Sequence, residues 1–121
     1  MKVFIADDSK VLRERLTEML SDVPGLEIVG CAQDVSEALS HIKKLNPDVV
    51  ILDIRMPGGS GMDVLQDIKR EHHAPTVIML TNYPYPQYRK KCLGLGADYF
   101  FDKSTEFEKM TELVKQISMR S

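Results

Sequence analysis

The stretch VVILDIRMPGGSG, residues 49–61, decides the fold class of this 121-residue chain. Four aliphatic residues in succession, 49–52, predict a strand that is buried on both faces, as in a parallel sheet covered by helices on each side. The strand runs directly into a carboxylate, Asp53, which is followed by a loop with Pro57 and three glycines rather than by a helix cap. An acid at the end of a buried strand needs a functional or structural reason, and the rest of the chain supplies one.

Short apolar runs alternate with amphipathic segments along the whole sequence. Strands are expected at 2–6, 27–32, 48–53, 76–81 and 98–101. Helices are expected over about 10–23, 35–45, 62–72, 87–95 and from 105 onward. Capping boxes predict two of the helix starts, Asp34 with Glu37 and Thr105 with Glu108. This fivefold βα alternation predicts an α/β domain with a parallel sheet between two layers of helices.

Length, charge and cysteine content narrow the class of protein. A chain of 121 residues with a net charge of −2 suits one domain and lacks the basic balance of a nucleic-acid-binding domain. No apolar run resembles a signal peptide or a membrane span. The isolated cysteines, Cys31 and Cys92, indicate reduced thiols in a cytoplasmic protein. We expect a single domain over residues 1–121, with no room for an output domain, that binds neither nucleic acid nor membrane.

Polar side chains follow four of the predicted strands. Asp7 and Asp8 follow the first strand, Asp53 and Thr81 end the third and the fourth, and Lys103 lies just beyond the fifth. Ligands of open parallel sheets bind at the carboxyl ends of the strands, so these groups should meet at one edge. Each residue alone has an ordinary explanation as a cap or a solvated side chain. Together, three mutually repelling carboxylates favour a bound hard cation such as Mg²⁺, and the lysine and hydroxyl suit a phosphoryl group.

The chain resembles the receiver domains of bacterial two-component response regulators. The similarity runs over essentially the whole sequence, from FIADDSKVLRERL through DVVILDIRMPGGSGMDVL and VIMLTNY to GLGADYFFDKS. The similarity rests on the ordered set of acids, threonine and lysine at successive strand ends. The resemblance implies the flavodoxin-like (βα)5 fold, with five parallel strands in the order 2-1-3-4-5 and helices on both faces.

The resemblance also implies a role for each carboxylate. Asp53 would accept a phosphoryl group, as a nucleophile, from the phosphohistidine of a histidine kinase or phosphotransfer protein. Asp8 and Asp53 would bind Mg²⁺ (or Mn²⁺) directly, together with the backbone carbonyl of Arg55. Asp7 would act through water. The metal would neutralise charge on the transferred group.

Further residues take roles around the phosphoryl group by the same resemblance. Lys103 would pair with phosphoryl oxygens, and the Thr81 hydroxyl would bond another one. Phe100 occupies the position of the family's switch aromatic. Pro57 and Gly58 would shape a loop whose backbone passes close to the site. The face formed by the fourth helix, fifth strand and fifth helix would then bind an output partner or a second copy of the domain.

The chain departs from the family's usual pattern in three respects. Ser104 follows Lys103, where many relatives have a proline after a cis bond, so we expect a trans bond and a different turn. The switch position holds Phe100 rather than tyrosine, so no hydroxyl is present there. Arg55 and Tyr83 lie beside the site and should tune how long the phosphoryl group lasts.

The resemblance describes a phosphoacceptor that signals rather than an enzyme with turnover, and alternatives stay open. The chain could be the receiver half of a DNA-binding transcription regulator rather than a stand-alone protein. An aspartyl-nucleophile phosphatase is a weaker alternative, because such enzymes want a second acid where Arg55 stands. A flavin-binding module of the same fold is disfavoured by the negative charge of Asp7 and Asp8.

Overall fold

Five parallel strands form the central sheet of the protein, in a computed structural model that describes residues 1–120. The strands are β1 (Lys2–Ala6), β2 (Glu27–Ala32), β3 (Val49–Leu52), β6 (Thr76–Thr81) and β7 (Tyr99–Asp102). They lie in the order β2-β1-β3-β6-β7 and every pair within this sheet is parallel. Counted along the chain, this is the predicted order 2-1-3-4-5, which is confirmed.

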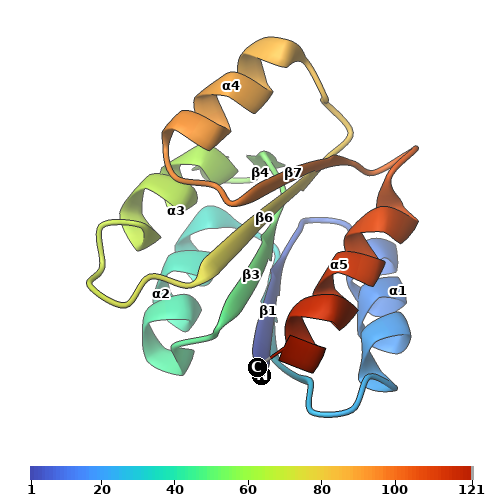
Figure 1. Cartoon of the computed structure of the whole chain (residues 1–121). Helices are drawn as coiled ribbons and strands as arrows, with labels where there is room; N and C mark the ends of the chain where they lie inside the picture. Colours follow the sequence, from blue (N-terminus) through green and yellow to red (C-terminus); the bar gives the residue numbers. More distant parts are fainter. Residues whose placement is uncertain (121) are drawn as a thin grey trace.

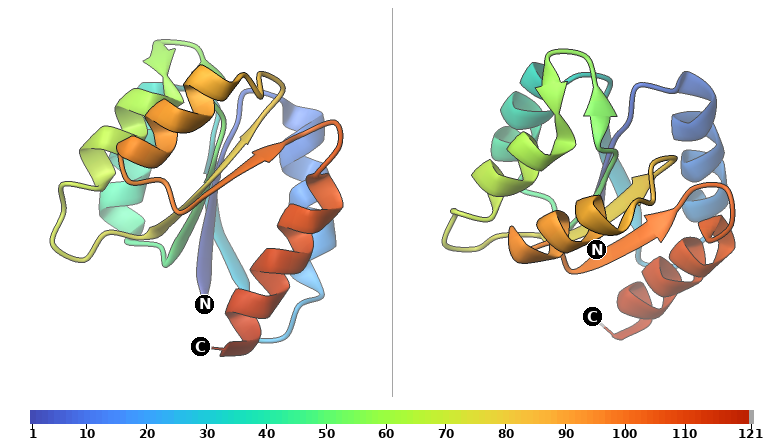
Figure 2. Two further views of the ribbon diagram at one scale, coloured as in Figure 1. Left: turned by 45° about the horizontal axis from the view of Figure 1, so that its top comes forward. Right: turned by 90° about the horizontal axis from the view of Figure 1, so that it is seen from above.

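Five helices cover the two faces of the sheet. They are α1 (Lys10–Ser21), α2 (Val35–Leu45), α3 (Gly61–Ile68), α4 (Pro86–Gly94) and α5 (Phe107–Arg120). Helices α1 and α5 lie on one face, and α2, α3 and α4 lie on the other (Figure 1). The view from above in Figure 2 shows the same division, with the sheet between the two groups.

Alternation within the central strands explains their unbroken hydrophobic runs. In β3, Val50 and Leu52 belong to the core beneath α2, α3 and α4, while Val49 and Ile51 belong to the core beneath α1 and α5. Val50 lies in register with Phe4 of β1. Since both faces of the strand are buried, no position along it favours a polar residue until the strand ends.

These two cores hold the layers together. The largest fully buried side chains are Phe4, Ile5, Leu16, Leu20, Ile51, Leu52, Leu65, Ile68, Ile78, Met79, Leu80 and Met110. Each such aliphatic or aromatic side chain contributes about 1.5–3 kcal/mol by its burial. A rigid sheet with its strand ends fixed in register is what places the polar residues that follow.

The starts of the second and fifth helices test the two predicted capping boxes. Asp34 accepts a hydrogen bond from the backbone N–H of Glu37 at 2.8 Å, so the predicted start of α2 is confirmed. The prediction for the fifth helix is wrong, because α5 begins at Phe107, too late for Thr105 to be its N-cap. Hydrogen bonds from Thr105 go instead to the side chain of Asp102.

Several element boundaries differ from the prediction by one or more residues. The third helix ends at Ile68 rather than at 72. Beyond it the backbone N–H groups bond to the carbonyl three residues back instead of four, as Arg70 N–H does to the Asp67 carbonyl at 3.3 Å. The fourth helix begins one residue early, with Pro86 in its first turn, where a proline costs no hydrogen bond. The fifth strand is shifted by one residue and ends at Asp102.

The loop after β3 is more ordered than expected. Two short antiparallel strands, β4 (Arg55–Met56) and β5 (Gly59–Ser60), form a hairpin there. The glycines at its turn have positive φ, 85° at Gly58 and 144° at Gly59, a region that favours glycine. After this hairpin Ser60 caps α3 and forms a full capping box with Asp63, a helix start that the sequence analysis did not predict.

Helix α4 is the most lightly anchored helix of the described chain. Of its nine described residues, Cys92 alone is buried. By comparison, α3 buries four residues although it is one residue shorter. Helix α4 therefore packs against β7 and the rest of the sheet through a small area.

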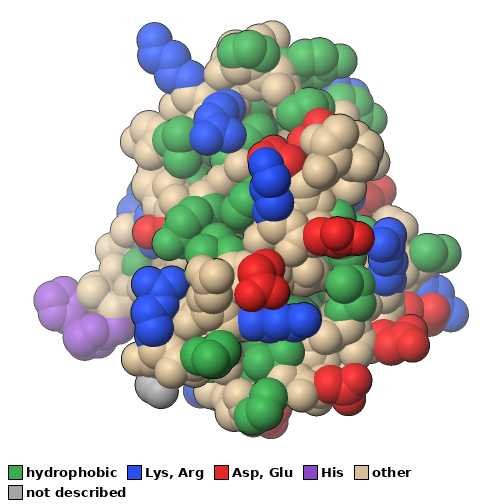
Figure 3. Space-filling view, turned by 45° about the vertical axis from the view of Figure 1, so that its right-hand side comes forward, with side chains coloured by type: hydrophobic (Ala, Val, Ile, Leu, Met, Phe, Trp, Pro, Cys, Tyr) green, Lys and Arg blue, Asp and Glu red, His purple; other side chains and the backbone are tan. Residues whose placement is uncertain are grey.

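The described surface carries mixed charge. On the face seen in Figure 3, acidic and basic side chains are interspersed, in keeping with the net charge of −2. No helix within residues 1–120 combines the length and the apolar character that a membrane span requires.

Candidate functional site

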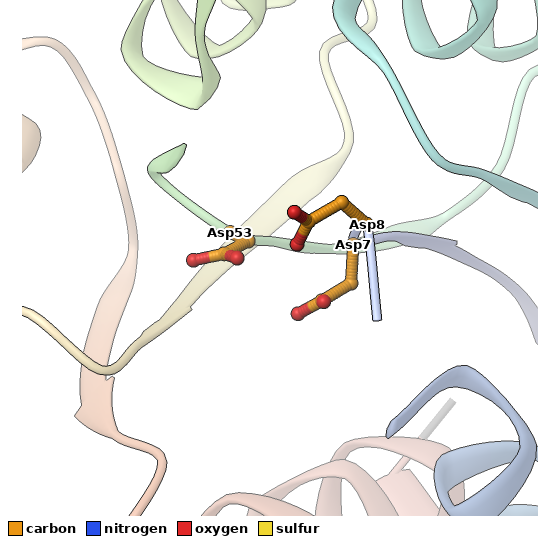
Figure 4. Close-up of side chains that lie close together, drawn as sticks. All are labelled: Asp7, Asp8 and Asp53. Carbon is orange, nitrogen blue, oxygen red and sulfur yellow. The ribbon is translucent and has the colours of Figure 1, made fainter. Parts of the chain in front are cut away.

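Three carboxylates meet at the carboxyl edge of the sheet. Strands β1 and β3 pair with Ala6 opposite Leu52, so the residues that follow, Asp7 and Asp53, leave the sheet side by side. One oxygen from each of Asp7, Asp8 and Asp53 lies within 4.8 Å of the others. Figure 4 shows the carboxylates of Asp7 and Asp8 directed toward Asp53. Asp7 and Asp53 are buried and Asp8 is exposed, so the group opens to solvent on the Asp8 side.

A lysine ammonium closes the inner side of this acidic group. Lys103 Nζ lies 2.6 Å from Asp7 Oδ2 and 3.1 Å from Asp53 Oδ2, and only 10% of its side chain is exposed. Burial lowers the pKa of Lys103, but the hydrogen bond to Asp7 and the charges of Asp53 and Asp7 outweigh it, so the pKa is raised. Lys103 is therefore a permanent cation that balances part of the acidic charge.

Burial also changes the titration of Asp53. It raises the pKa of this carboxyl to about 6; the charge of Lys103 opposes the rise, and the neighbouring Asp7 adds to it. Asp53 Oδ1 accepts a hydrogen bond from the backbone N–H of Ile54 at 2.8 Å, which fixes the carboxylate plane. Without a bound metal ion, ionised Asp53 is thus held at a cost to the fold, even with Lys103 beside it.

That cost gives a pH-dependent prediction for the metal-free protein. Since the native pKa of Asp53, about 6, lies above its ordinary 3.8, the native state binds more protons between these values. Stability from this group is present below pH 3.8 and is lost as pH rises through 6, by up to about 3 kcal/mol. Asp53→Asn should therefore be more stable than wild type at pH 7.5, with the gain shrinking toward pH 4. Urea unfolding with a chelator at several pH values checks this; a gain independent of pH would contradict it.

Thr81 lies at the end of β6 and connects to the lysine through the backbone. Its side chain is fully buried, and its Oγ1 accepts a hydrogen bond from the backbone N–H of Tyr83 at 3.0 Å. Its carbonyl accepts a hydrogen bond from the backbone N–H of Lys103 at 2.9 Å. The two predicted phosphoryl-binding residues are therefore held against one another.

Phe100 is a core residue in this structure. It is 5% exposed and belongs to the core beneath α2, α3 and α4. The guanidinium of Arg89 lies 5.7 Å from its ring centroid and donates a hydrogen bond to its backbone carbonyl at 3.3 Å. The structure thus has the predicted switch aromatic in a buried position, with a residue of α4 against it.

The loop beside Asp53 contains a close backbone approach. A Cβ at Gly61 would lie 1.7 Å from the carbonyl oxygen of Asp53, closer than any side chain allows. Gly58 is needed for its positive φ instead, and the carbonyl of Pro57 accepts a hydrogen bond from Val35 N–H at 3.1 Å. The sequence analysis expected a close approach in this loop, and the structure shows that it occurs at Gly61.

An arginine and three tyrosines gather beyond the ends of β3 and β6, the strands that lead to Asp53 and Thr81. The Arg55 guanidinium lies 4.0 Å from the ring centroid of Tyr83 and hydrogen-bonds to the side chain of Tyr88. The Tyr85 ring lies between, 6.5 Å from Tyr83 and 5.7 Å from Tyr88. The structure therefore brings together the predicted pair, Arg55 and Tyr83, and adds two tyrosines that no sequence spacing indicated.

The turn after β7 agrees with the predicted departure from the family. The peptide bonds of residues 1–120 are all trans, including the one between Lys103 and Ser104. Lys103 nevertheless reaches both buried acids. Hence the site is assembled without the proline that many relatives have.

Comparison with known proteins agrees with this geometry. The family model described as the response regulator receiver domain matches residues 3–115. The chain is 30% identical to the response regulator GacA of Pseudomonas syringae over 97% of its own length and 55% of that protein. It is 46% identical to a protein-glutamate methylesterase/protein-glutamine glutaminase of Xanthomonas campestris, over 85% of this chain and 29% of that one. It thus spans about half or less of these curated relatives.

A solved structure gives the same answer for the fold. A DNA-binding response regulator of the LuxR family from Staphylococcus aureus superposes with a TM-score of 0.87 at 30% identity, covering 97% of this chain and 98% of that one. The family match, the sheet order and the group of acids at the strand ends all agree. The chain belongs to the family of response regulator receiver domains.

Proposed function

We propose that residues 1–121 act as a single cytoplasmic receiver domain that accepts a phosphoryl group on Asp53 from a histidine kinase or phosphotransfer protein. The observation that carries this proposal is the convergence of Asp7, Asp8 and Asp53 within 4.8 Å, with Lys103 in contact with two of them. Receiver domains work in two-component systems, where phosphorylation and Mg²⁺ binding are typical. The domain would assist its own phosphorylation and dephosphorylation without turning over other substrates.

The acidic group has the donors that a hard divalent cation requires. Asp8 and Asp53 would hold Mg²⁺ or Mn²⁺ directly with the backbone carbonyl of Arg55, and Asp7 would act through water. Oxygen donors suit such ions, and Mg²⁺ usually binds through one or two carboxylates and keeps several waters. When bound, the ion would supply positive charge to the transferred group.

Asp53, Lys103 and Thr81 would each act on the phosphoryl group during its transfer. The Asp53 carboxylate forms a bond to phosphorus while the bond from phosphorus to the donor's imidazole nitrogen breaks, and that nitrogen keeps the electron pair. Lys103, already 3.1 Å from Asp53 Oδ2, can follow the new phosphoryl oxygens. The Thr81 hydroxyl accepts from Tyr83 N–H, so its own proton is available to donate to a phosphoryl oxygen.

Arg55 lies two residues after Asp53 and Tyr83 two after Thr81, so their cluster would border the path by which water reaches a phosphorylated Asp53. Arg55 connects the hairpin after β3 to Tyr83, which follows β6, and to Tyr88 of α4. A bridge of this kind would limit the approach of water and so lengthen the life of the phosphoryl group.

Uptake of phosphate from a small donor tests the proposed function. Wild-type protein incubated with acetyl phosphate and Mg²⁺ should gain the mass of one phosphoryl group, because the site needs only a donor and a cation. Chelation of the metal should remove the gain. Intact-mass spectrometry gives the answer directly; no gain under any metal condition would refute the proposal.

A second candidate concerns the context of the domain. The match to a DNA-binding response regulator of the LuxR family favours the chain being the receiver half of a transcription regulator. In that case the output would be a separate DNA-binding domain rather than a free protein partner. Sequencing the coding region on both sides of the chain distinguishes the two contexts.

We expect Thr81 to transmit phosphorylation to the face formed by α4, β7 and α5, where a partner or a second copy would bind. When the Thr81 hydroxyl turns toward a phosphoryl oxygen, it leaves a space. The ring of Phe100 on the neighbouring strand β7 can move into that space. Thr81→Ala should still accept phosphate on Asp53 but should transmit the change poorly. Amide NMR shifts across α4 and β7, with and without beryllofluoride, measure the transmission.

Thr111→Ala is the matched control for this experiment, because Thr111 is also buried but lies on α5 away from the acids. The control should respond like wild type. Equal beryllofluoride shifts in wild type and Thr81→Ala would show that Thr81 does not carry the change.

A further inference from the structure

The turn between β7 and α5 carries Lys103, and its sequence is Asp-Lys-Ser-Thr-Glu over residues 102–106. A lysine side chain has four rotatable bonds, so its ammonium reaches a fixed point only if the backbone beneath it is fixed. The turn has no proline and no cis bond to do this. Hydrogen bonds within the turn must therefore set the direction of Lys103.

Asp102 makes the first set of these bonds across Lys103. Its Oδ1 accepts a hydrogen bond from the backbone N–H of Ser104 at 2.9 Å and another from the Ser104 hydroxyl at 2.7 Å. An aspartate that accepts from the N–H two residues on forms an Asx turn, which fixes the residue between them. These bonds from Ser104, and further ones from Thr105, lower the pKa of Asp102, in keeping with an ionised acceptor.

Glu106 makes the second set. Its Oε1 accepts from the backbone N–H of Asp102 at 3.1 Å, and its own N–H donates to the carbonyl of Asp102 at 2.8 Å. The backbone N–H of Lys103 donates in turn to the carbonyl of Thr81 at 2.9 Å. The lysine is thus held between two acids of its own turn and the end of β6.

The side chain of Asp102 accepts from its own turn, whereas Asp7 and Asp53 bind the lysine ammonium. Asp102 therefore fixes the backbone of Lys103, while Asp7 and Asp53 balance the charge of its ammonium. We propose that Asp102 is a positioning residue for phosphoryl transfer, acting through the Asx turn that aims Lys103 at Asp53. The inference rests on the proposed function, since it assigns Asp102 a part in the same reaction.

Two substitutions at Asp102 distinguish its role as a hydrogen-bond acceptor in the turn from the effect of its negative charge. Asp102→Ala removes the acceptor, so phosphorylation by acetyl phosphate at saturating donor and Mg²⁺ should slow about tenfold, as expected for a misplaced catalytic group. Asp102→Asn keeps an Oδ1 that can accept from Ser104, so it should stay within about twofold of wild type. Glu71→Ala, which removes an exposed acid in the loop between α3 and β6, controls for loss of negative charge.

A double substitution tests whether the effect passes through the lysine. Lys103→Met should slow the reaction strongly on its own. If Asp102 acts only by aiming Lys103, adding Asp102→Ala to Lys103→Met should cause no further slowing. Independent, multiplying losses would overturn the proposal. The dissociation constant for Mg²⁺ should be the same in wild type and Asp102→Ala, which excludes a general loss of the site.

A measurement without metal or phosphate keeps the inference separate from the proposed function. In wild type and Asp102→Asn, NMR of the Lys103 side chain should show a shifted, slowly exchanging ammonium, because Lys103 is bound by Asp7 and Asp53. In Asp102→Ala the signal should move toward that of a free lysine. If wild type takes up no phosphate, the proposed function fails; if the Lys103 signal is unchanged in Asp102→Ala, the positioning role fails.

Discussion

Asp53→Asn should abolish covalent phosphorylation of the protein, whereas Asp7→Asn and Asp8→Asn should slow it and leave it detectable. Asp53 follows the central strand β3, and its Oδ2 is in contact with Lys103, the cation that would follow the new phosphoryl oxygens. An amide nitrogen and carbonyl cannot replace the carboxylate as a nucleophile. Asp7 has one oxygen bound by Ser9 N–H and the other by Lys103, which suits a supporting role.

Intact mass after incubation with acetyl phosphate and Mg²⁺ measures this result for all three variants. We expect complete loss for Asp53→Asn. For Asp8→Asn we expect a rate at least about tenfold lower, because a ligand of the cation is weakened. Unfolding curves show whether each variant is folded. Undiminished labelling of folded Asp53→Asn would move the phosphorylation site to another residue.

Gly61→Ala should destabilise the fold by at least about 3 kcal/mol, the largest effect that we expect from any single methyl group in this chain. The added Cβ would lie 1.7 Å from the Asp53 carbonyl oxygen and 2.8 Å from its carbonyl carbon, both of them backbone atoms. The hydrogen bond from Gly61 N–H to the Ile54 carbonyl at 2.6 Å holds the two segments together. One of them must move, and the movement would displace Asp53.

Gly94→Ala is the matched control. A Cβ at Gly94 meets nothing within 4 Å, and the residue is the last of α4. Alanine there should be neutral or stabilise by up to about 1 kcal/mol through its helix propensity. Urea unfolding of both variants checks the contrast, and equal stabilities would contradict the close approach at Gly61.

The position of the acids could be predicted from the sequence because it depends on topology alone. Parallel strands end at the same edge of a sheet, so residues that follow β1 and β3 must meet whatever their side chains do. The continuous apolar run of residues 49–52 was sufficient to indicate a central strand. Asp7 and Asp53 are accordingly found together, with Asp8 beside them.

What the sequence did not predict depends on competition between nearby hydrogen-bond partners. Thr105 and Glu108 have the spacing of a capping box, but Asp102 binds Thr105 and Glu106 binds the backbone of Asp102, so the helix begins later. The third helix also ends early, because Arg70 N–H and Glu71 N–H bond to the carbonyls three residues back instead of four. Beyond its end Lys69 donates to the Pro75 carbonyl at 2.7 Å and to Asp98 at 2.8 Å.

The close approach at Gly61 and the bridge from Arg55 to Tyr88 needed three-dimensional distances. A glycine in the first turn of a helix has no sequence signature that separates it from a flexible loop glycine. Arg55 and Tyr88 belong to segments that are separated by the whole of α3 and β6. Sequence spacing predicts contacts within an element and at strand ends, whereas contacts between loops depend on the final packing.

The single buried residue of α4, Cys92, has a consequence for local unfolding. A helix that buries one small side chain gains little from packing, so its amide hydrogens should exchange with solvent by a local opening far below the global unfolding free energy. The sheet and α3 should protect their amides much longer. The helix that borders the proposed output face would then be the part of the domain with the lowest energetic barrier to rearrangement. For the same reason its exposed positions can change during evolution with little loss of stability, so specificity for a partner can diverge while the acidic site and the core stay the same.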